Sequence, residues 1–336
     1  MTPTTTNSEA PVCQLCGAPG VIKSKWIAPY SIYFCGDCEL LFAHPIPSES
    51  DLQEFYQGFL YRKPEIEKIK RLSKSKETEL KKYFGEHLST GARFLDYGAG
   101  TGVASSAAMN LGCEVHYYEI DHDAHDFVKQ NISIDSSKMY FDKEQIPKEN
   151  FELIFCDNVI EHVRYPNEFL EELLGYLTPG GKLVVKTPNA RNYELLFFPK
   201  ISVLGYALRS TKYNSKSHFF KTLLGRIWNC DPPRHLFSFS KKSIQRLCAN
   251  QNKVQVDIRY YHTPVFEYSL MQRYRKHPFP NSFNWFLMLI PAVLELLFKP
   301  LYVAMRFLGL LRGSGIAGVI TKDRPEASGQ TTGTNS

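Results

Sequence analysis

Four cysteines near the N-terminus have side chains and spacing that suit metal binding. Cys13-Gln-Leu-Cys16 and Cys35-Gly-Asp-Cys38 form two Cys-x-x-Cys pairs separated by 18 residues. Two pairs at this spacing are typical of a four-thiolate zinc site, and redox-active pairs are the less favoured alternative. Four thiolates would complete the coordination of the ion, so the predicted zinc is structural rather than catalytic.

A glycine-rich loop forms a second set of residues with chemical potential. The segment FLDYGAGTG places Gly98, Gly100 and Gly102 between an apolar strand pattern and a helix pattern, with Asp96 ahead of them. Alternating glycines permit a tight turn and let backbone N–H groups approach a ligand at the N-terminus of the helix. A glycine-rich loop alone is weak evidence, because many are only turns.

Polar residues at the ends of the next predicted strands strengthen the case for a ligand site. Glu119 ends the second strand, 23 residues after Asp96, where a carboxylate would accept from ribose hydroxyls. Asp142 stands at the end of the third strand and suits an exocyclic amine, and Asp157 and Asn158 end the fourth. Open α/β sheets bind ligands at the carboxyl ends of their strands, so we expect these side chains to share one site.

The elements that position these residues alternate in type. From Arg93 onward, strand patterns alternate with helix patterns, and the strand patterns are ARFLDYG, CEVHYYEI, KMYF, FELIFCDNVI and KLVVKTP. This alternation predicts an α/β fold with a parallel sheet covered by helices on both faces. A helix pattern (SFSKKSIQRLCANQN) and two strand patterns (KVQVDIRYYH and GIAGVITK) extend it after residue 237.

The chain divides into five predicted parts. They are a disordered start (1–11), a zinc-binding knob (12–47), a connector with an amphipathic helix (48–90), an α/β domain (91–325) and a mobile tail (326–336). Apolar insertions, expected to be helical, interrupt the α/β domain at about 190–230 and 281–312. The sequence lacks a secretory signal pattern at its start, and its eight cysteines are not arranged as a disulfide framework, which favours a cytoplasmic location.

Together these motifs resemble a known family. FLDYGAGTG, YYEID and DKEQIPKENFELIFCDNVIEHVRYPNEFLEELLGYLTPGGKLVVKTPN are similar to class I S-adenosylmethionine-dependent methyltransferases, whose sheet is Rossmann-like. The branch that they resemble most includes ubiquinone-pathway O-methyltransferases and bacterial glycan methyltransferases. The segment from Cys13 to Gln57 resembles the zinc-binding segment that precedes many sugar methyltransferases. A nicotinamide-dependent dehydrogenase is the rival interpretation, but Gly-x-Gly-x-Gly with an acid at its head favours the methyl donor.

The resemblance implies a role for each residue of the cofactor site. In chain order these roles are Asp96 for the methionyl ammonium, Gly98, Gly100 and Gly102 for the amino-acid end of the cofactor, Glu119 for the ribose, Asp142 for the adenine amine, and Asp157 and Asn158 beside the methionine portion.

The resemblance also implies an acceptor side. Glu161 and His162 follow the fourth strand, where ubiquinone-pathway relatives carry Glu-x-x-Glu-His and can hold a divalent metal. Asn158 replaces the first acid of that motif in this chain, so the motif is incomplete as a metal site. The alternative role for Glu161 and His162 is to cap and orient the following loop.

Three further side chains are expected near the acceptor. His235, in Pro-Pro-Arg-His-Leu, lies where the family has a histidine and would act as a base or as an orienting donor. Tyr56 and Tyr61 resemble the tyrosines that follow the zinc segment in sugar methyltransferases. Ordinary structural packing is the alternative for all three.

Charge is divided unevenly along the chain. The net charge of +6 combines +14 in residues 191–336 (21 basic against 7 acidic) with −8 in the first 190 (19 against 27). The insertion FNWFLMLIPAVLELLFKPLYVAMRFLGLLRG is broken by prolines into pieces too short to cross a bilayer. Such pieces favour peripheral contact with an anionic membrane surface, with burial inside the protein as the alternative. Bulky aliphatics between the basic residues argue against nucleic acid as a partner.

These features together predict an S-adenosylmethionine-dependent methyltransferase with a structural zinc. The expected acceptor is a small molecule, namely a sugar hydroxyl or carbon in a lipid-linked or nucleotide-linked glycan precursor. O-methylation of a lipid-soluble phenol is the second prediction. A non-catalytic zinc-ribbon protein that binds the cofactor is the third.

Overall fold

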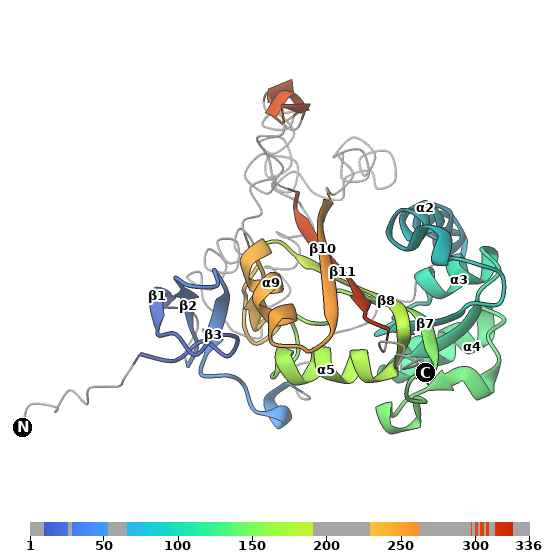
Figure 1. Ribbon diagram of the computed structural model, residues 1–336, viewed down its shortest axis with the longest axis horizontal. Coiled ribbons are helices and arrows are strands. Elements are labelled where there is room, and N and C mark those ends of the chain that lie inside the picture. The colour runs from blue at the N-terminus through green and yellow to red at the C-terminus, as the bar shows by residue number, and fades with distance from the viewer. Residues whose placement is uncertain are drawn as a thin grey trace, which may run out of the picture.

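Two sheets organise the chain (Figure 1). The computed structural model describes residues 10–25, 29–52, 66–190, 229–261 and 313–324, with a few further positions between 297 and 308. The large sheet has the strand order β10 (Val254–Tyr261), β11 (Gly315–Lys322), β8 (Leu177–Pro188), β7 (Phe151–Asp157), β4 (Arg93–Tyr97), β5 (Glu114–Tyr118) and β6 (Met139–Tyr140).

The predicted α/β class is confirmed by the strand directions. Strands β8, β7, β4, β5 and β6 pair in parallel, whereas β11 is antiparallel to both β8 and β10. The described helices are α2 (Ile66–Phe84), α3 (Val103–Asn110), α4 (His122–Asn131), α5 (Pro166–Tyr176) and α9 (Lys241–Ala249). Each predicted strand appears within a few residues of its pattern.

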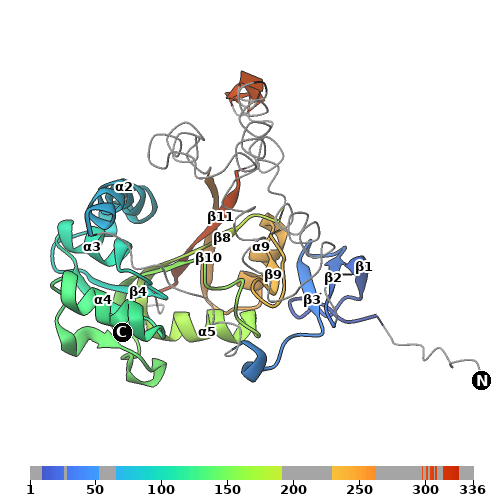
Figure 2. The same cartoon turned by 180° about the vertical axis from the view of Figure 1, so that it is seen from behind.

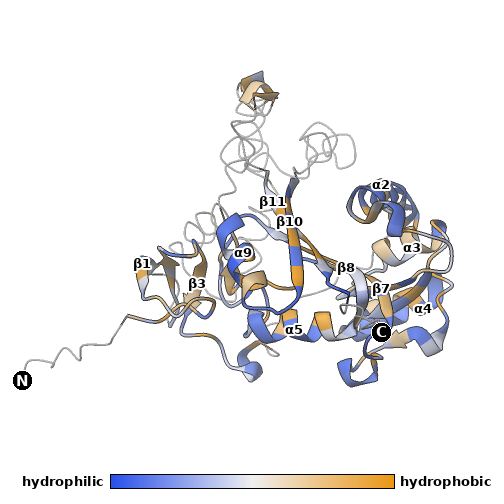
Figure 3. Ribbon diagram, viewed as in Figure 1, coloured by the Kyte–Doolittle hydropathy of each residue, from blue (hydrophilic) through white to orange (hydrophobic). Residues whose placement is uncertain are grey.

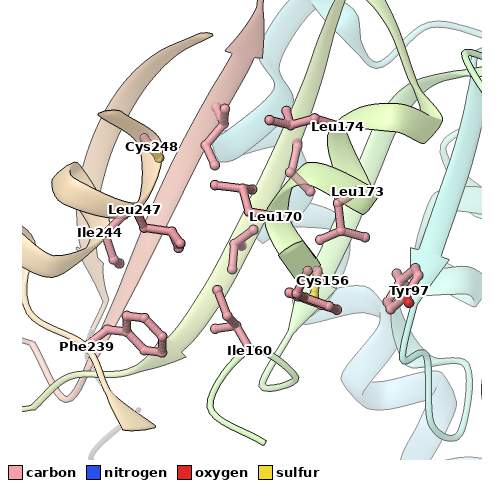
Figure 4. Close-up of a cluster of buried hydrophobic side chains, with 14 of the residues drawn as sticks. Tyr97, Cys156, Ile160, Leu170, Leu173, Leu174, Phe239, Ile244, Leu247 and Cys248 are labelled. Carbon is pink, nitrogen blue, oxygen red and sulfur yellow. The ribbon is translucent and has the colours of Figure 1, made fainter. Parts of the chain in front are cut away.

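Successive side chains along the strands point to opposite faces of the large sheet, and both faces are buried. Phe94 and Phe155 pack with apolar residues of α2 and α3. Their neighbours Leu95 and Cys156 point to the opposite face, in the cluster that α5 and α9 complete. Figure 4 shows that cluster, with Leu170, Leu173 and Leu174 from α5 and Ile244, Leu247 and Cys248 from α9 directed toward the sheet. Helices therefore cover both faces, as the sequence predicts.

Helix α2 is amphipathic. Figure 3 shows mostly hydrophilic residues along it, while its apolar residues Ile69 and Leu80 are buried. Most charged residues of α2 are exposed, but the side chain of Lys76 is only 17% exposed and belongs to the site described below.

The small sheet joins the N-terminal knob to the rest of the chain. Its strand order is β1 (Gly20–Lys25), β2 (Ser31–Cys35), β3 (Leu41–His44) and β9 (Phe237–Ser238). Figure 2 shows β9 beside β3, and Phe42 is paired in register with Phe237. The backbone N–H of Ala43 also donates to the carbonyl of Leu236 at 2.8 Å. The knob is therefore completed by a strand from the C-terminal half of the chain.

The four knob cysteines converge. The Sγ atoms of Cys13 and Cys38 are 3.5 Å apart, those of Cys16 and Cys35 are 3.4 Å apart, and all four lie within 4.8 Å of one another. Zn–S bonds of about 2.3 Å in a tetrahedron would separate the sulfurs by about 3.8 Å, so one ion fits between them. The Cys13 and Cys38 thiols share a hydrogen bond, which lowers the pKa of Cys13 and raises the pKa of Cys38.

Some predictions fall outside the described residues. Tyr56, Tyr61 and most of both apolar insertions lie there. Among the helices that the structure describes, none is long and apolar enough to cross a membrane.

We expect the purified chain to contain about one zinc ion and the Cys35→Ser variant to lose it, because a structural site needs all four thiolates. The variant should also unfold at a lower temperature, since metal binding contributes folding free energy. Elemental analysis after dialysis, paired with thermal denaturation, makes the measurement. Cys113→Ser is the matched control, because Cys113 is buried outside the cluster and should leave the zinc in place. Full zinc content in Cys35→Ser would contradict the assignment.

Candidate functional site

The glycine loop lies between β4 and α3 and needs glycine for two physical reasons. Gly98, Gly100 and Gly102 have φ angles of 70°, 54° and 70°, in the left-handed region that disfavours other residues. A Cβ atom on Gly98 would also lie 2.4 Å from a methyl carbon of Val159. Gly98 therefore permits close contact between the glycine loop and the loop that follows β7.

Asp96 lies beneath the glycine loop, near the end of β4. It is buried, and its Oδ2 accepts hydrogen bonds from the backbone N–H of Ser105 at 2.8 Å and from the Ser105 hydroxyl at 2.6 Å. Burial raises the pKa of Asp96 to about 7, although the bonds from Ser105 oppose this shift. A carboxylate in this position is stabilised by an incoming cation, as the predicted contact with the methionyl ammonium requires.

Glu119 follows β5 and holds the glycine loop directly. Its Oε2 accepts from the N–H of Gly100 at 2.8 Å, and its Oε1 accepts from the N–H groups of Ile120 and Asp121. Oε1 already accepts two hydrogen bonds, whereas Oε2 accepts one and retains a lone pair that can accept from a ribose hydroxyl. Asp142 lies two residues beyond β6 and is exposed, at the same end of the sheet.

Asp157 belongs to an ion-pair cluster that the sequence analysis missed. Its Oδ2 lies 3.0 Å from Lys76 Nζ and 2.9 Å from Lys186 Nζ, and both lysines also pair with Glu79. Burial alone would raise the pKa of Asp157, but the two lysines hold it below its usual value. The only sequence signal for this cluster is a lysine inside the apolar strand KLVVKTP, because Lys76 sits in a helix rich in exposed charge. Asn158, the next residue, donates from Nδ2 to Asp157 Oδ1 at 2.9 Å.

Glu161 and His162 lie in the loop after β7. Glu161 is buried, and its Oε2 accepts from the Thr187 hydroxyl at 3.0 Å, whereas its Oε1 has no hydrogen-bond partner among the described residues. Burial raises the pKa of Glu161 to about 8. His162 Nδ1 lies 2.7 Å from the carbonyl of Arg234, to which it donates. Burial and the Arg234 guanidinium lower the pKa of His162 to about 4.

His235 comes from a distant part of the sequence to complete this group. Its buried ring lies 4.8 Å from that of His162, measured between centroids. One ligand atom from each of Glu161, His162 and His235 lies within 4.8 Å of the others. A carboxylate and two imidazoles could hold a divalent cation, which would lower the pKa of a bound hydroxyl. Asn158 still replaces the first acid of the sequence motif, and His235 adds a third possible donor from a segment far along the chain.

The glycine loop lies next to Glu161, His162 and His235, which we call the acidic–histidine group. Val159 packs against Gly98, and it lies between Asn158 and Glu161 in the same loop. The charge of Asp157 also acts on both Asp96 and Glu161, adding to the effect of burial on the pKa of each carboxyl group. The structure thus brings together eight predicted cofactor residues and three of the five predicted catalytic residues at one end of the sheet.

We expect S-adenosylmethionine affinity to fall as the pH drops below about 7. The cationic ammonium favours the carboxylate form of Asp96, whose pKa is about 7 without ligand, so protonation competes with binding. Calorimetric titrations between pH 8 and 6 should show this trend. Asp96→Asn should bind at least about tenfold more weakly and lose most of the pH dependence. Glu171→Gln, an exposed site on α5, is the control and should match the parent chain. Equal affinity across that range in the parent chain would contradict the role of Asp96.

Comparison with known proteins agrees with this architecture. A family model described as "Methyltransferase domain" matches residues 66–253, which is more than half of the chain. The solved structure of Haemonchus contortus phosphoethanolamine N-methyltransferase 2 with S-adenosyl-L-methionine aligns with a TM-score of 0.50 at 14% identity. That alignment covers 85% of this chain and 62% of the other, and it shows likeness of fold alone.

Curated relatives match a shorter span. A ubiquinone biosynthesis O-methyltransferase of Bradyrhizobium sp. (strain ORS 278) is 31% identical over 111 residues, which are 31% of this chain and 43% of the relative. The mitochondrial ubiquinone biosynthesis O-methyltransferase of Schizosaccharomyces pombe is 29% identical over 106 residues, covering 29% of this chain and 38% of the relative. The chain thus spans less than half the length of these relatives. The glycine loop and the strand-end acids lie within the matched residues, and the chain belongs to the methyltransferase-domain family.

Proposed function

We propose that this enzyme transfers the methyl group of S-adenosylmethionine to a hydroxyl oxygen of its acceptor. The observation that carries the proposal is the meeting of Glu161, His162 and His235 beside the glycine loop. Methyl transfer to oxygen requires a group that takes the hydroxyl proton, and this cluster supplies carboxylate and imidazole groups for that task.

The reaction that we propose is a direct displacement. The acceptor oxygen bonds to the methyl carbon as the bond from carbon to sulfur breaks, which leaves S-adenosylhomocysteine. Positioning of the two reactants in line supplies much of the rate. The hydroxyl proton passes to His235, which is neutral because burial and Arg234 lower its pKa well below the usual value. Glu161 lies close to His162 and His235, and we propose that it orients the acceptor or the two histidines.

A sugar hydroxyl on a lipid-linked or nucleotide-linked glycan precursor is the acceptor that we favour. Residues 191–336 carry a net charge of +14, which suits the phosphate groups of such acceptors. The knob, which resembles that of sugar methyltransferases, is paired through β3 and β9 to the segment that carries His235. We therefore propose that the acceptor lies on this side of the sheet, with Tyr56 and Tyr61 as further contacts.

A lipid-soluble phenol is the second acceptor class. It is supported by the names of the relatives, which are ubiquinone biosynthesis O-methyltransferases. A phenol has a pKa near 10, so it loses its proton to a weak base more readily than a sugar hydroxyl does. The low pKa of His235 suits that chemistry.

We further propose that the late apolar insertion binds an anionic membrane surface. The described positions there expose large apolar side chains, with exposed fractions of 65% for Leu297, 91% for Phe307 and 67% for Leu308. Lys299, Arg306 and Arg312 lie in the same stretch of sequence and suit acidic headgroups. Contact with the membrane would bring the enzyme to a lipid-linked or lipid-soluble acceptor at the inner face.

Methyl transfer can be tested with tritiated S-adenosylmethionine and a panel of nucleotide sugars, polyprenyl-phosphate sugars and alkylated phenols. We expect label in one class, and His235→Ala should lower kcat by about 10²–10⁴-fold while leaving the Kd for S-adenosylmethionine unchanged. His87→Ala is the control, because η1 (Gly85–His87) precedes β4 at the opposite end of the sheet. Unchanged turnover in His235→Ala would exclude it as the base.

Membrane binding can be tested by flotation with vesicles that contain anionic lipid. We expect the chain to float at low salt and less so at high salt, because screening weakens headgroup attraction. The Phe307→Asp/Leu308→Asp variant should remain at the bottom of the gradient. Val12→Asp removes a comparably exposed apolar residue from the knob and should float like the parent chain. If the parent chain does not float, the insertion is not a membrane contact.

A further inference from the structure

The N-terminal knob contacts helix α9 at both of its ends. Its two Cys-x-x-Cys pairs, residues 13–16 and 35–38, are called here the first and the second knuckle. Their sulfur atoms lie within 4.8 Å of one another, where the predicted zinc would join them. The first knuckle contacts the C-terminal end of α9, and the second knuckle contacts its N-terminal end. Because α9 has nine residues, these two contacts are about 14 Å apart along the helix.

Two asparagine amides bind the backbone carbonyls of the first knuckle. Asn250, at the C-cap of α9, donates from Nδ2 to the carbonyl of Leu15 and to Oδ1 of Asn167, each at 2.9 Å. Asn167, in the first turn of α5, donates from Nδ2 to the carbonyl of Gln14 at 3.0 Å. A backbone carbonyl can only accept, so these contacts fix the orientation of both amides. The two asparagines therefore bind consecutive carbonyls of the turn between the cysteines.

These contacts depend on the conformation of the first knuckle. The N–H of Cys13 donates to the carbonyl of Ala18, and the N–H of Gly17 donates to the carbonyl of Cys13, both at 2.8 Å. The carbonyls of Gln14 and Leu15 remain for the asparagine amides. The buried Leu15 side chain belongs to the same hydrophobic cluster as the apolar residues of α9. A knuckle that opens would withdraw both carbonyls and this side chain from α5 and α9.

The second knuckle contacts the other end of α9. The hydroxyl of Ser240, the N-cap residue, donates to the carbonyl of Cys38 at 3.4 Å. Lys242 Nζ also lies 3.1 Å from Glu39 Oε1, although this pair is partly exposed and contributes little. Strand β9 lies directly before Ser240 and pairs with β3. The segment from His235 to the start of α9 therefore runs along the knob.

We infer that zinc binding and the placement of α9 are coupled, with Asn167 and Asn250 as positioning residues. Metal–thiolate bonds stabilise the folded knuckles, so loss of the ion would release both ends of α9. Such coupling is reciprocal: the asparagine contacts raise the affinity of the knob for zinc, and zinc stabilises α9. The inference rests on the predicted zinc site, and only its consequence for the acceptor side rests on the proposed function.

Hydrogen exchange on the full chain tests the coupling without any substitution. We expect removal of zinc by a chelator to speed exchange of the amides of α9 and β9 by at least about tenfold, while α3 and α4 keep their protection. The Kd for S-adenosylhomocysteine should stay within about twofold, because β4 and β5 lie away from the knuckles. Unchanged exchange in α9, or equal loss of protection in α3 and α4, would overturn the inference.

Asparagine variants test the reciprocal effect on zinc affinity. Asn250→Ala and Asn167→Ala remove the amide donors, so we expect the Kd for zinc, measured by competition with a chelator, to rise about two- to tenfold in each. The double variant should show a larger rise. Asn131→Ala is the matched control, because Asn131 Nδ2 donates to the carbonyl of Phe127 at 2.8 Å within α4.

The outcomes separate the coupling from the claims on which it rests. A parent chain that binds no zinc would overturn both the zinc site and the coupling. Zinc binding by the parent chain, with the same Kd in the two asparagine variants as in the control, would overturn the coupling alone. Full turnover in His235→Ala would count against the proposed function and leave the coupling in place.

Discussion

In the candidate site, the backbone carbonyl of Glu161 links the two segments that carry the acidic–histidine group. The carbonyl of Glu161 accepts from the N–H of Leu236 at 2.8 Å and from the N–H of Phe237 at 3.3 Å. These bonds join the loop after β7, which carries Glu161 and His162, to the segment that carries His235. The two parts are more than 70 residues apart in the sequence, so no local structure would bring the three side chains together. With the bonds in place, the acidic–histidine group lies next to the glycine loop through Val159.

The knob supports the same segment from the other side. Strand β3 pairs with β9 directly after His235, and Cys13, Leu15, Cys38 and Phe42 share a buried cluster with Leu236, Phe237 and Phe239. The Ser240 hydroxyl, which caps α9, also donates to the carbonyl of Cys38 at 3.4 Å. A metal on the four cysteines would therefore stabilise the knob beside the segment that carries His235. Asp96 and Glu119, on β4 and just after β5, lie in the other half of the large sheet.

The sequence predicted the elements better than the contacts between them. Strand and helix periodicity located β4 to β8, and the acids at their ends followed from where parallel strands carry ligands. The pairing of β3 with β9, the ion pairs of Lys76 and Lys186, and the contact of Asp231 with His235 could not be predicted. Each of these contacts depends on how segments are placed relative to one another, or on how a side chain is oriented in a turn. Neither can be derived from the spacing of hydrophobic residues. Tyr56 and Tyr61 stay predictions from resemblance, because they lie outside the described residues.

The central claim is that the glycine loop and the acidic–histidine group serve one reaction. A crystal structure with S-adenosylhomocysteine tests it most directly. The account predicts the amino-acid end of the ligand beside Gly98 and Asp96, the ribose on Glu119, and the sulfur directed toward His235 and Glu161 with no side chain between. A ligand whose sulfur faces away from His235, or that binds elsewhere on the sheet, would contradict the account.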